Sequence, residues 1–149
     1  MTGETTSDRP RLGLCLSEFP LDADGRWRNV AEVVGRVEAS GAEGLWLADH
    51  ILWHSKAIDA QSTLPALASH ATSLTIGSCV LQLPLRDPIT VAKTMANAQM
   101  MAPGRVVCGV GIGENAEEYE RLGRSMSTRG AVIDASIDEI RRVWGQRGG

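Results

Sequence analysis

Residues 74–111 read LTIGSCVLQLPLRDPITVAKTMANAQMMAPGRVVCGVG, and this stretch holds one complete strand–helix–strand pattern. The apolar run at 74–81 is typical of a strand that is covered on both faces. Asp87 and Pro88 then predict a helix start, because Asp can accept a hydrogen bond from a free backbone N–H and proline at the first helical position loses none. A second apolar run at 106–111 predicts the next strand.

The same pattern extends toward the amino terminus, where apolar runs at 12–17 and 45–48 predict two more strands. The four runs begin at positions 12, 45, 74 and 106, so consecutive starts are 33, 29 and 32 residues apart. This spacing accommodates a strand and a returning helix, as in a parallel βαβ array. It is compatible with an open doubly wound sheet or with part of a (β/α)₈ barrel. A complete barrel takes about 250 residues, so a chain of 149 residues can form only part of one.

Helical periodicity fills the intervals between the predicted strands. Valines at 30, 33, 34 and 37 predict a helix that ends at Gly41. The next helix carries Leu64, Leu67, Ala68 and Ala71, and we expect Pro65 in its first turn, since a proline deeper in a helix removes a hydrogen bond. Residues 1–10 are expected to form a flexible tail, followed by a single domain over residues 11–149.

Composition excludes several classes of partner. The chain is 43% hydrophobic and 22% charged, with a net charge of −3 and no basic block, so neither nucleic acid nor an anionic membrane is expected to bind it. No apolar stretch approaches the roughly 20 residues of a membrane span. The three cysteines form no C-x-x-C pair, which indicates a reducing, cytoplasmic setting without structural disulfides.

Candidate site residues follow the predicted strands, at the edge where parallel sheets bind ligands. Asp49 and His50 follow the second strand. An imidazole there can move a proton or bind an anionic ring edge, although the pair can equally cap the following turn. His50 and His54 lie four residues apart, but no fuller metal-binding pattern surrounds them, so we expect no metal site.

The glycine-rich run GVGIGE at 109–114 allows two interpretations. Glu114 replaces the last glycine of the dinucleotide fingerprint and would repel a pyrophosphate. The run therefore indicates either a strand end without side chains, which a flat ligand can approach, or a tight turn with no ligand. Cys79 on the third strand is a possible nucleophile, but we interpret it as a small buried core residue.

Four segments together resemble the luciferase-like monooxygenases. EASGAEGLWLADH at 38–50, TIGSCVLQLPLRDP at 75–88 and PGRVVCGVGIGEN at 103–115 are similar to the second, third and fourth strand regions of that family. Residues 129–144 are similar to the helix that closes its fourth unit. The resemblance covers nearly the whole chain, in order and without large gaps, and it implies the first half of a TIM-type (β/α)₈ barrel.

The resemblance also implies a cofactor and a site. Family members bind reduced FMN or a deazaflavin coenzyme (8-hydroxy-5-deazaflavin) at the carboxyl ends of their strands. Asp49 and His50 would lie beside the ring and a small organic substrate, and Glu114 aligns with a proton donor of the deazaflavin-dependent sugar-phosphate dehydrogenases. The Cys79–Val80 bond would be a non-prolyl cis peptide that backs the ring. The other expected coenzyme contacts are Gly111, Gly113 and Asn115. We expect Asp49, His50, Gly111 and Glu114 to face one cavity.

Two hypotheses about function remain open. One is an oxidoreductase or monooxygenase whose half-barrel is completed by a second copy or by a complementary chain. The other is a truncated, non-catalytic paralogue that acts as an interaction module. In both, two unpaired sheet edges and an apolar inner face, carrying Leu12 or Leu14 and Val107 or Val110, predict association.

Overall fold

The computed structural model describes residues 11–18, 20–26, 28–53 and 58–145. The expected tail at 1–10 lies outside this part of the chain. Four parallel strands form one sheet in sequential order: β1 (Gly13–Leu16), β2 (Gly44–Leu47), β3 (Thr75–Gln82) and β4 (Val106–Gly111). The helices are α1 (Val30–Ala39), α2 (Ala60–His70), α3 (Pro88–Met101), α4 (Ala116–Arg121) and α5 (Arg129–Gly145), with short 3₁₀ turns at Leu83–Leu85 and Met126–Thr128.

The strand order decides between the two architectures left open by the sequence. A doubly wound sheet reverses its strand order at a switch point, whereas these strands follow one another without reversal. The (β/α)₄ half-barrel prediction is therefore confirmed at the level of fold. All four predicted strands are present, with bounds that differ from the prediction by at most one residue.

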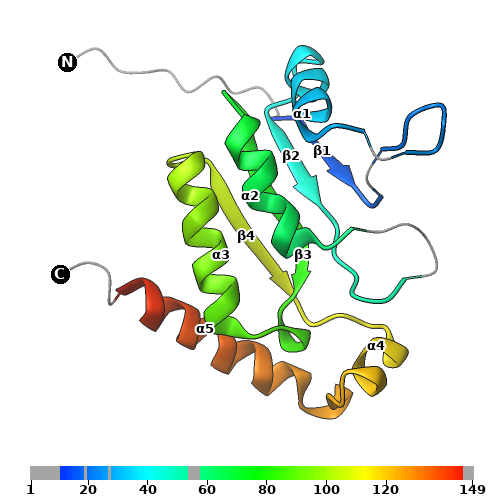
Figure 1. Cartoon of the computed structure of the whole chain (residues 1–149). Coiled ribbons are helices and arrows are strands. Elements are labelled where there is room, and N and C mark those ends of the chain that lie inside the picture. Colours follow the sequence, from blue (N-terminus) through cyan, green and yellow to red (C-terminus); the bar gives the residue numbers. More distant parts are fainter. Residues whose placement is uncertain (1–10, 19, 27, 54–57, 146–149) are drawn as a thin grey trace.

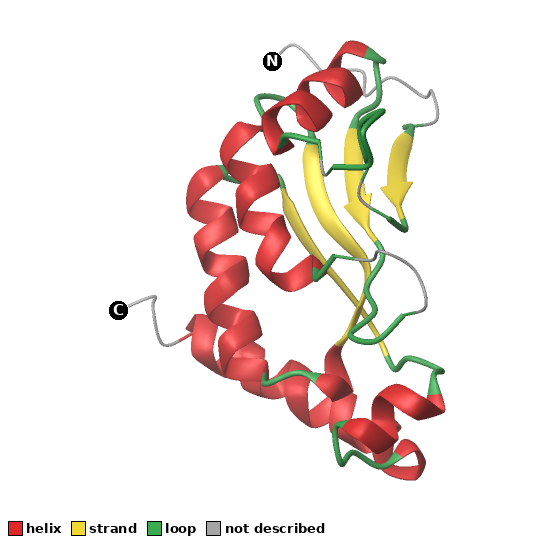
Figure 2. Ribbon diagram, turned by 45° about the vertical axis from the view of Figure 1, so that its right-hand side comes forward, coloured by secondary structure: helices red, strands yellow, loops and turns green. Residues whose placement is uncertain are grey.

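The helices form a layer over one face of the sheet, and the opposite face is left open (Figures 1 and 2). The core lies between the two layers. It is built from fully buried side chains of the middle strands and the first three helices, including Leu45, Leu47, Ile76, Leu64 and Val91. Along each strand, the residues alternate between this core and the open face.

Strand register identifies the residues of the open face. Cys15, Trp46, Gly77 and Val107 lie in one row across the four strands. Val107 is 43% exposed, whereas Val110 packs against the core, so β4 has Val107 on the open face. On β1 the expectation of an inward leucine is wrong. Leu14 pairs with the buried Leu45, so it lies on the helix side at the sheet edge, and Cys15 occupies the open face.

Local signals placed most helix ends correctly. Asp87 caps α3 by accepting the Thr90 N–H, and Gly41, with φ of +80°, follows the end of α1. The expectation for Pro65 is wrong, because α2 begins earlier than predicted and Pro65 lies in its interior. The earlier start is explained by Asp59, whose side chain accepts the Ser62 N–H and caps the helix there.

Cys15, Cys79 and Cys108 are free thiols. Among the helices of the described ranges, none has the length and apolar character needed to cross a bilayer.

Candidate functional site

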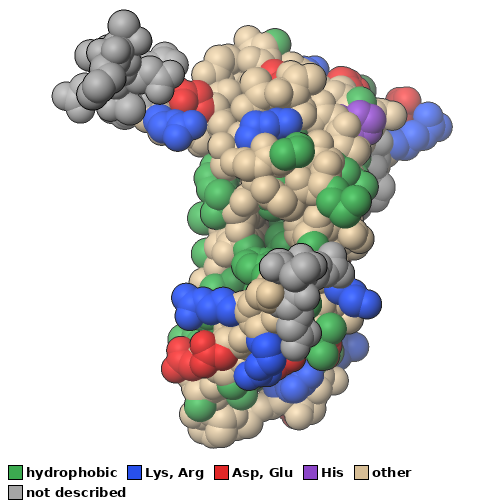
Figure 3. Space-filling model, turned by 90° about the vertical axis from the view of Figure 1, so that its left-hand side faces the viewer, with side chains coloured by type: hydrophobic (Ala, Val, Ile, Leu, Met, Phe, Trp, Pro, Cys, Tyr) green, Lys and Arg blue, Asp and Glu red, His purple; other side chains and the backbone are tan. Residues whose placement is uncertain are grey.

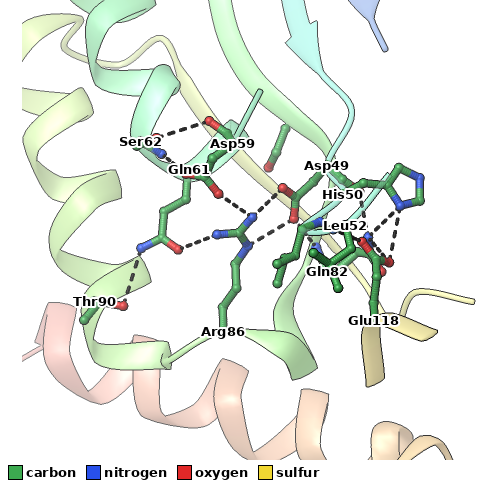
Figure 4. A network of polar contacts seen from close by, with 12 residues as sticks. Asp49, His50, Leu52, Asp59, Gln61, Ser62, Gln82, Arg86, Thr90 and Glu118 are labelled. Carbon is green, nitrogen blue, oxygen red and sulfur yellow. Dashed lines mark hydrogen bonds and ion pairs between the residues drawn. The ribbon is translucent and has the colours of Figure 1, made fainter. Parts of the chain in front are cut away.

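A buried polar network occupies the carboxyl end of the sheet, and three consecutive strand–helix units contribute to it (Figure 4). His50 follows β2, Gln82 is the last residue of β3, and Glu118 lies in α4 after β4. Their side chains meet within hydrogen-bond distance, although they are 32 to 68 residues apart in sequence. Polar residues that follow consecutive strands therefore lie together at this edge, as expected for parallel strands.

Glu118 is the centre of this network. Its side chain is fully buried and accepts the backbone N–H groups of Ile51 and Leu52 at 2.6 and 2.8 Å. It also contacts Gln82 Nε2 at 3.1 Å and His50 Nδ1 at 3.3 Å. Burial by itself would raise the pKa of Glu118, but these hydrogen bonds together lower the pKa below the ordinary glutamate value. The carboxylate is therefore an anion held in a cage of donors.

His50 is oriented by this carboxylate. Both hydrogen bonds of its ring engage Nδ1, one with Glu118 and one with Gln82 at 3.1 Å. Gln82 Nε2 has two hydrogens, and Asp49 O at 2.8 Å and Glu118 can accept both of them. This arrangement favours a proton on Nδ1, donated to Glu118, and an unprotonated Nε2.

The His50 ring also lies at the edge of the solvent-accessible rim. Its side chain is 26% exposed and stacks on Trp53, with ring centroids 3.8 Å apart and planes inclined by 19°. A carboxylate on Nδ1 of a partly exposed imidazole is the arrangement that enzymes use for a general base.

Asp49, the expected neighbour of His50 in catalysis, is held in a buried ion pair. Arg86 binds it through Nη2 to Oδ1 at 2.5 Å and Nε to Oδ2 at 3.0 Å, and Oδ2 also accepts the Gln82 N–H. Arg86 also reaches Asp59, which caps α2, and Gln61 in the first turn of α2. Because the Asp49 carboxylate is fully buried, it does not face a cavity shared with His50, and that prediction is wrong for Asp49. Its position suits a residue that fixes the end of β2.

Gly111, the last residue of β4, and Gly113 in the loop after it are packed against β3. A Cβ at Gly111 would come within 2.5 Å of Val80 Cγ2. Gly113 has a φ of +69°, and a Cβ there would overlap Gln82 Oε1, a buried atom with no hydrogen-bond partner. Asn115 caps α4 by accepting the Glu117 N–H. The protein's own packing therefore explains both glycines.

The remaining predicted residues lie on the loop after β4 and on the open face. Glu114 is exposed, and the carboxylate that contacts His50 is Glu118 instead. The Cys79–Val80 peptide is cis, as predicted. The interpretation of Cys79 as a buried core residue is wrong. The register between β3 and β4 shifts in the interval from Ser78 to Leu81, and Cys79 and Val80 are both exposed there.

Sequence reasoning missed Glu118 and Arg86. Glu118 lies beside Tyr119, and both side chains are buried on the inner side of α4. The aromatic Tyr119 was a usable local signal for that side. Arg86 immediately precedes the Asp87–Pro88 helix start. No local pattern indicates that its guanidinium turns back to the end of the preceding strand.

Comparison with known proteins identifies the family. The family described as luciferase-like monooxygenase matches residues 11–148. The chain belongs to this family. Among curated relatives, the F420-dependent glucose-6-phosphate dehydrogenase of Amycolatopsis mediterranei is 33% identical over 125 residues, which cover 78% of this chain and 38% of the relative. The enzyme of the same name from Kribbella flavida is 30% identical over 129 residues, covering 81% and 39%. This luciferase-like chain thus spans under two-fifths of the length of these relatives.

Solved structures share the fold of this family member. A monooxygenase from Streptomyces bottropensis has a TM-score of 0.79 at 17% identity, over 91% of this chain and 43% of its own. The oxygenating constituent of 3,6-diketocamphane monooxygenase from Pseudomonas putida, in complex with FMN, has a TM-score of 0.75 at 16% identity, over 90% and 39%. The coenzyme F420-dependent tetrahydromethanopterin reductase of Methanopyrus kandleri has a TM-score of 0.58 at 19% identity, over 76% and 30%.

Proposed function

We propose that this luciferase-like chain supplies the coenzyme-ring side of an oxidoreductase site that uses a reduced deazaflavin or FMN. The observation that carries the proposal is the His50–Glu118 pair at the carboxyl end of the sheet, with Nδ1 held and the ring partly exposed. The deazaflavin is favoured, because the two relatives described above are named as F420-dependent enzymes. The monooxygenase activity of other family members is the alternative reaction.

The open face beside the rim fits a planar, largely apolar ring. Val80 is 43% exposed there. Gly109 and Gly111 lie next to it and carry no side chain that would hold a ring away from the sheet. Val80, Gly111 and the Cys79 backbone would therefore support one face of the coenzyme. When bound, a reduced deazaflavin transfers a hydride, whereas reduced FMN activates dioxygen.

The chain's own residues would handle the proton that accompanies this chemistry. At the rim, His50 Nε2 would take a proton from a substrate hydroxyl when the deazaflavin is bound in its oxidised, hydride-accepting form. It would give a proton to a substrate oxygen when the reduced form donates the hydride. Glu118, whose carboxylate lies 3.3 Å from Nδ1, would hold the ring in the orientation that this transfer needs. Asp49 and Arg86 would act at a distance, by fixing the backbone from which His50 projects. Glu114 remains a proposed proton donor from the exposed loop.

We also propose that other strands of a barrel cover the open face, supplied by a second copy or by a complementary chain. Exposed apolar side chains on this face, including Val80 and Val107, support association. The interaction-module hypothesis shares this surface but requires no coenzyme.

Anaerobic titration with reduced deazaflavin, and separately with reduced FMN, tests the proposal. We expect a saturable spectral change with the deazaflavin. The change should weaken in Gly111→Val, which places a branched side chain beside Val80, and persist in Gly35→Val, where a Cβ on α1 meets no atom within 4 Å. The coenzyme titration is done on the purified chain with and without an assembling partner. Binding only in the presence of the partner would show that the site is present but incomplete in the single chain. Absence of binding in the assembled protein would leave the interaction module as the better account.

A further inference from the structure

Ser78 has a buried hydroxyl in the middle of the sheet. The residue lies on β3 and is 1% exposed, and its Oγ donates to the carbonyl oxygen of Gly109 on β4 at 2.7 Å. Ser78 is in register with the buried Leu47 of β2, so its side chain lies on the helix side of the sheet. Neighbouring parallel strands are normally joined by backbone hydrogen bonds. This side chain therefore forms an additional link between β3 and β4.

The link lies where the two strands lose their regular pairing. Pairing is regular up to Ser78, and it resumes at Leu81. Between those positions β3 has two residues, Cys79 and Val80, whereas β4 has only one, Gly109. The extra residue is a β-bulge, which disrupts the backbone ladder locally. Because a carbonyl oxygen within a sheet needs a hydrogen-bond donor, the Ser78 hydroxyl stabilises the bulge by donating to Gly109.

The bulge determines which side chains reach the open face. In a regular strand, consecutive residues alternate between the two faces of the sheet. Here Cys79 and Val80 are consecutive and both exposed, and the residues on either side of them are buried. Bulges are frequent beside active sites, where they redirect a side chain. This bulge therefore presents Val80, the side chain that would support the coenzyme ring.

Val80 has no side chain of β4 beside it to hold it in place. A Cβ at Gly109 would lie 3.8 Å from Val80 Cγ1, and a Cβ at Gly111 would lie 2.5 Å from Cγ2. Since both neighbours are glycines, the position of Val80 depends on the backbone of the bulge. We propose that Ser78 is a positioning residue for the coenzyme, because its hydroxyl holds the bulge against β4 and thereby fixes Val80 beneath the ring. This inference rests on the proposed function.

Anaerobic titration of Ser78→Ala with the reduced deazaflavin tests the inference, in whichever form of the protein, alone or assembled, the wild type binds it. Loss of the hydroxyl should weaken binding about five- to tenfold, as expected for one hydrogen bond. Ser78→Thr keeps the hydroxyl and should bind as tightly as the wild type. Ser69→Ala is the matched control, because Ser69 Oγ also donates to a carbonyl oxygen at 2.7 Å, that of Ala66, but at an exposed position of α2. This control should leave binding unchanged.

A second readout follows the bulge itself, without any coenzyme. Cys79 is exposed on the bulge, so the rate at which iodoacetamide alkylates its thiol, measured by mass spectrometry, reports on the local backbone. We expect faster alkylation of Cys79 in Ser78→Ala and an unchanged rate in Ser78→Thr and Ser69→Ala. Circular dichroism of the same samples shows whether each variant is folded.

Folded Ser78→Ala that binds the deazaflavin as the wild type does would overturn the inference. Binding by Ser78→Thr as weak as that of Ser78→Ala would do the same, and so would an unchanged alkylation rate in Ser78→Ala. If Ser78→Ala does not fold, Ser78→Thr decides alone, because wild-type binding supports the role of the hydroxyl and weaker binding contradicts it. A wild-type protein that binds no coenzyme in any form would instead contradict the proposed function itself.

Discussion

Glu118 has one buried carboxylate that fixes two parts of the site, the Ile51–Leu52 backbone and the His50 ring. Glu118→Gln keeps the shape but replaces one oxygen by an amide that faces the Gln82 amide. Hydrogen bonds to charged groups contribute about 1.5–3 kcal/mol, so we expect the free energy of unfolding to fall by about 2 kcal/mol. Glu117→Gln, at an exposed position of the same helix, is the control in chemical denaturation and should change little. Equal stability of the two variants would contradict this role of Glu118.

The same residue predicts a pH dependence. The folded-state pKa of Glu118 lies below the ordinary value of 4.5, so the folded chain binds a proton less readily than the unfolded chain does. Its contribution to stability is then fully present well above pH 4.5 and is lost as the pH falls through the folded-state pKa. Unfolding at several pH values should show a steeper acid loss in the wild type than in Glu118→Gln. Parallel curves would argue against an ionised Glu118.

For single residues, the sequence predicted His50 but not its partner Glu118. A histidine after a strand is visible as a local pattern. The Glu118 contact joins positions 68 residues apart, and it depends on how α4 folds back over the rim. Glu114 was the nearer candidate in the motif, yet the loop leaves it exposed.

The Asp49–Arg86 pair acts between elements, because it joins the end of β2 to the turn after β3 and, through Asp59, to the start of α2 (Figure 4). Asp49→Asn removes one carboxylate from a buried arginine. Breaking a buried pair costs about 3–5 kcal/mol, and since Asp59 still pairs with Arg86, we expect the lower end of this range. Asp24→Asn, in the exposed pair with Arg26 at 3.8 Å, should change the unfolding free energy little. A similarly small change for Asp49→Asn would mean that the Asp49–Arg86 pair contributes little to the stability of the fold.

Gly113 lies in the loop after β4, and Gly25 provides a matched control for a substitution there. Both have positive φ, at +69° and +74°, but only Gly113 faces an atom, Gln82 Oε1, where a Cβ would lie. An alanine at positive φ costs about 1–2 kcal/mol at either position. Gly113→Ala should cost about 1–3 kcal/mol more than Gly25→Ala, as overpacking does, and should weaken coenzyme binding. Thermal unfolding of both variants provides the comparison. Equal losses of stability would show that the Gln82 side chain moves aside without destabilising the fold.

The helices and strands are the features that the sequence predicted best. The strands and capped helices follow from apolar periodicity and from single residues such as Asp87 and Gly41. Pro65 was misplaced because Asp59 provides a stronger start signal one turn earlier. The exposure of Cys79 follows from an irregular register between β3 and β4, which no local pattern in β3 specifies.

At the scale of the whole molecule, two surfaces differ in character. The helix layer buries the core, whereas apolar side chains remain uncovered on the open face of the sheet and along the flank formed by α3, β4 and α5. A hollow of about 420 Å³ lies on that flank, lined by Met95, Ala96, Gln99, Met100, Val106, Cys108 and Trp144. Figure 3 shows hydrophobic side chains gathered in the narrow middle of this side. β1 and β4 are the outer strands of the sheet, and no further strand of the described ranges pairs with either of them.

We propose that the open face is the interior of a barrel and not a finished surface. Light scattering of the purified chain at micromolar concentration tests it most directly, with and without a candidate complementary chain. We predict a mass well above the 16.0 kDa of one chain, or a defined complex when the complementary chain is added. A monodisperse 16.0 kDa particle that unfolds cooperatively would contradict the claim, because the sheet would then be stable with this face in water.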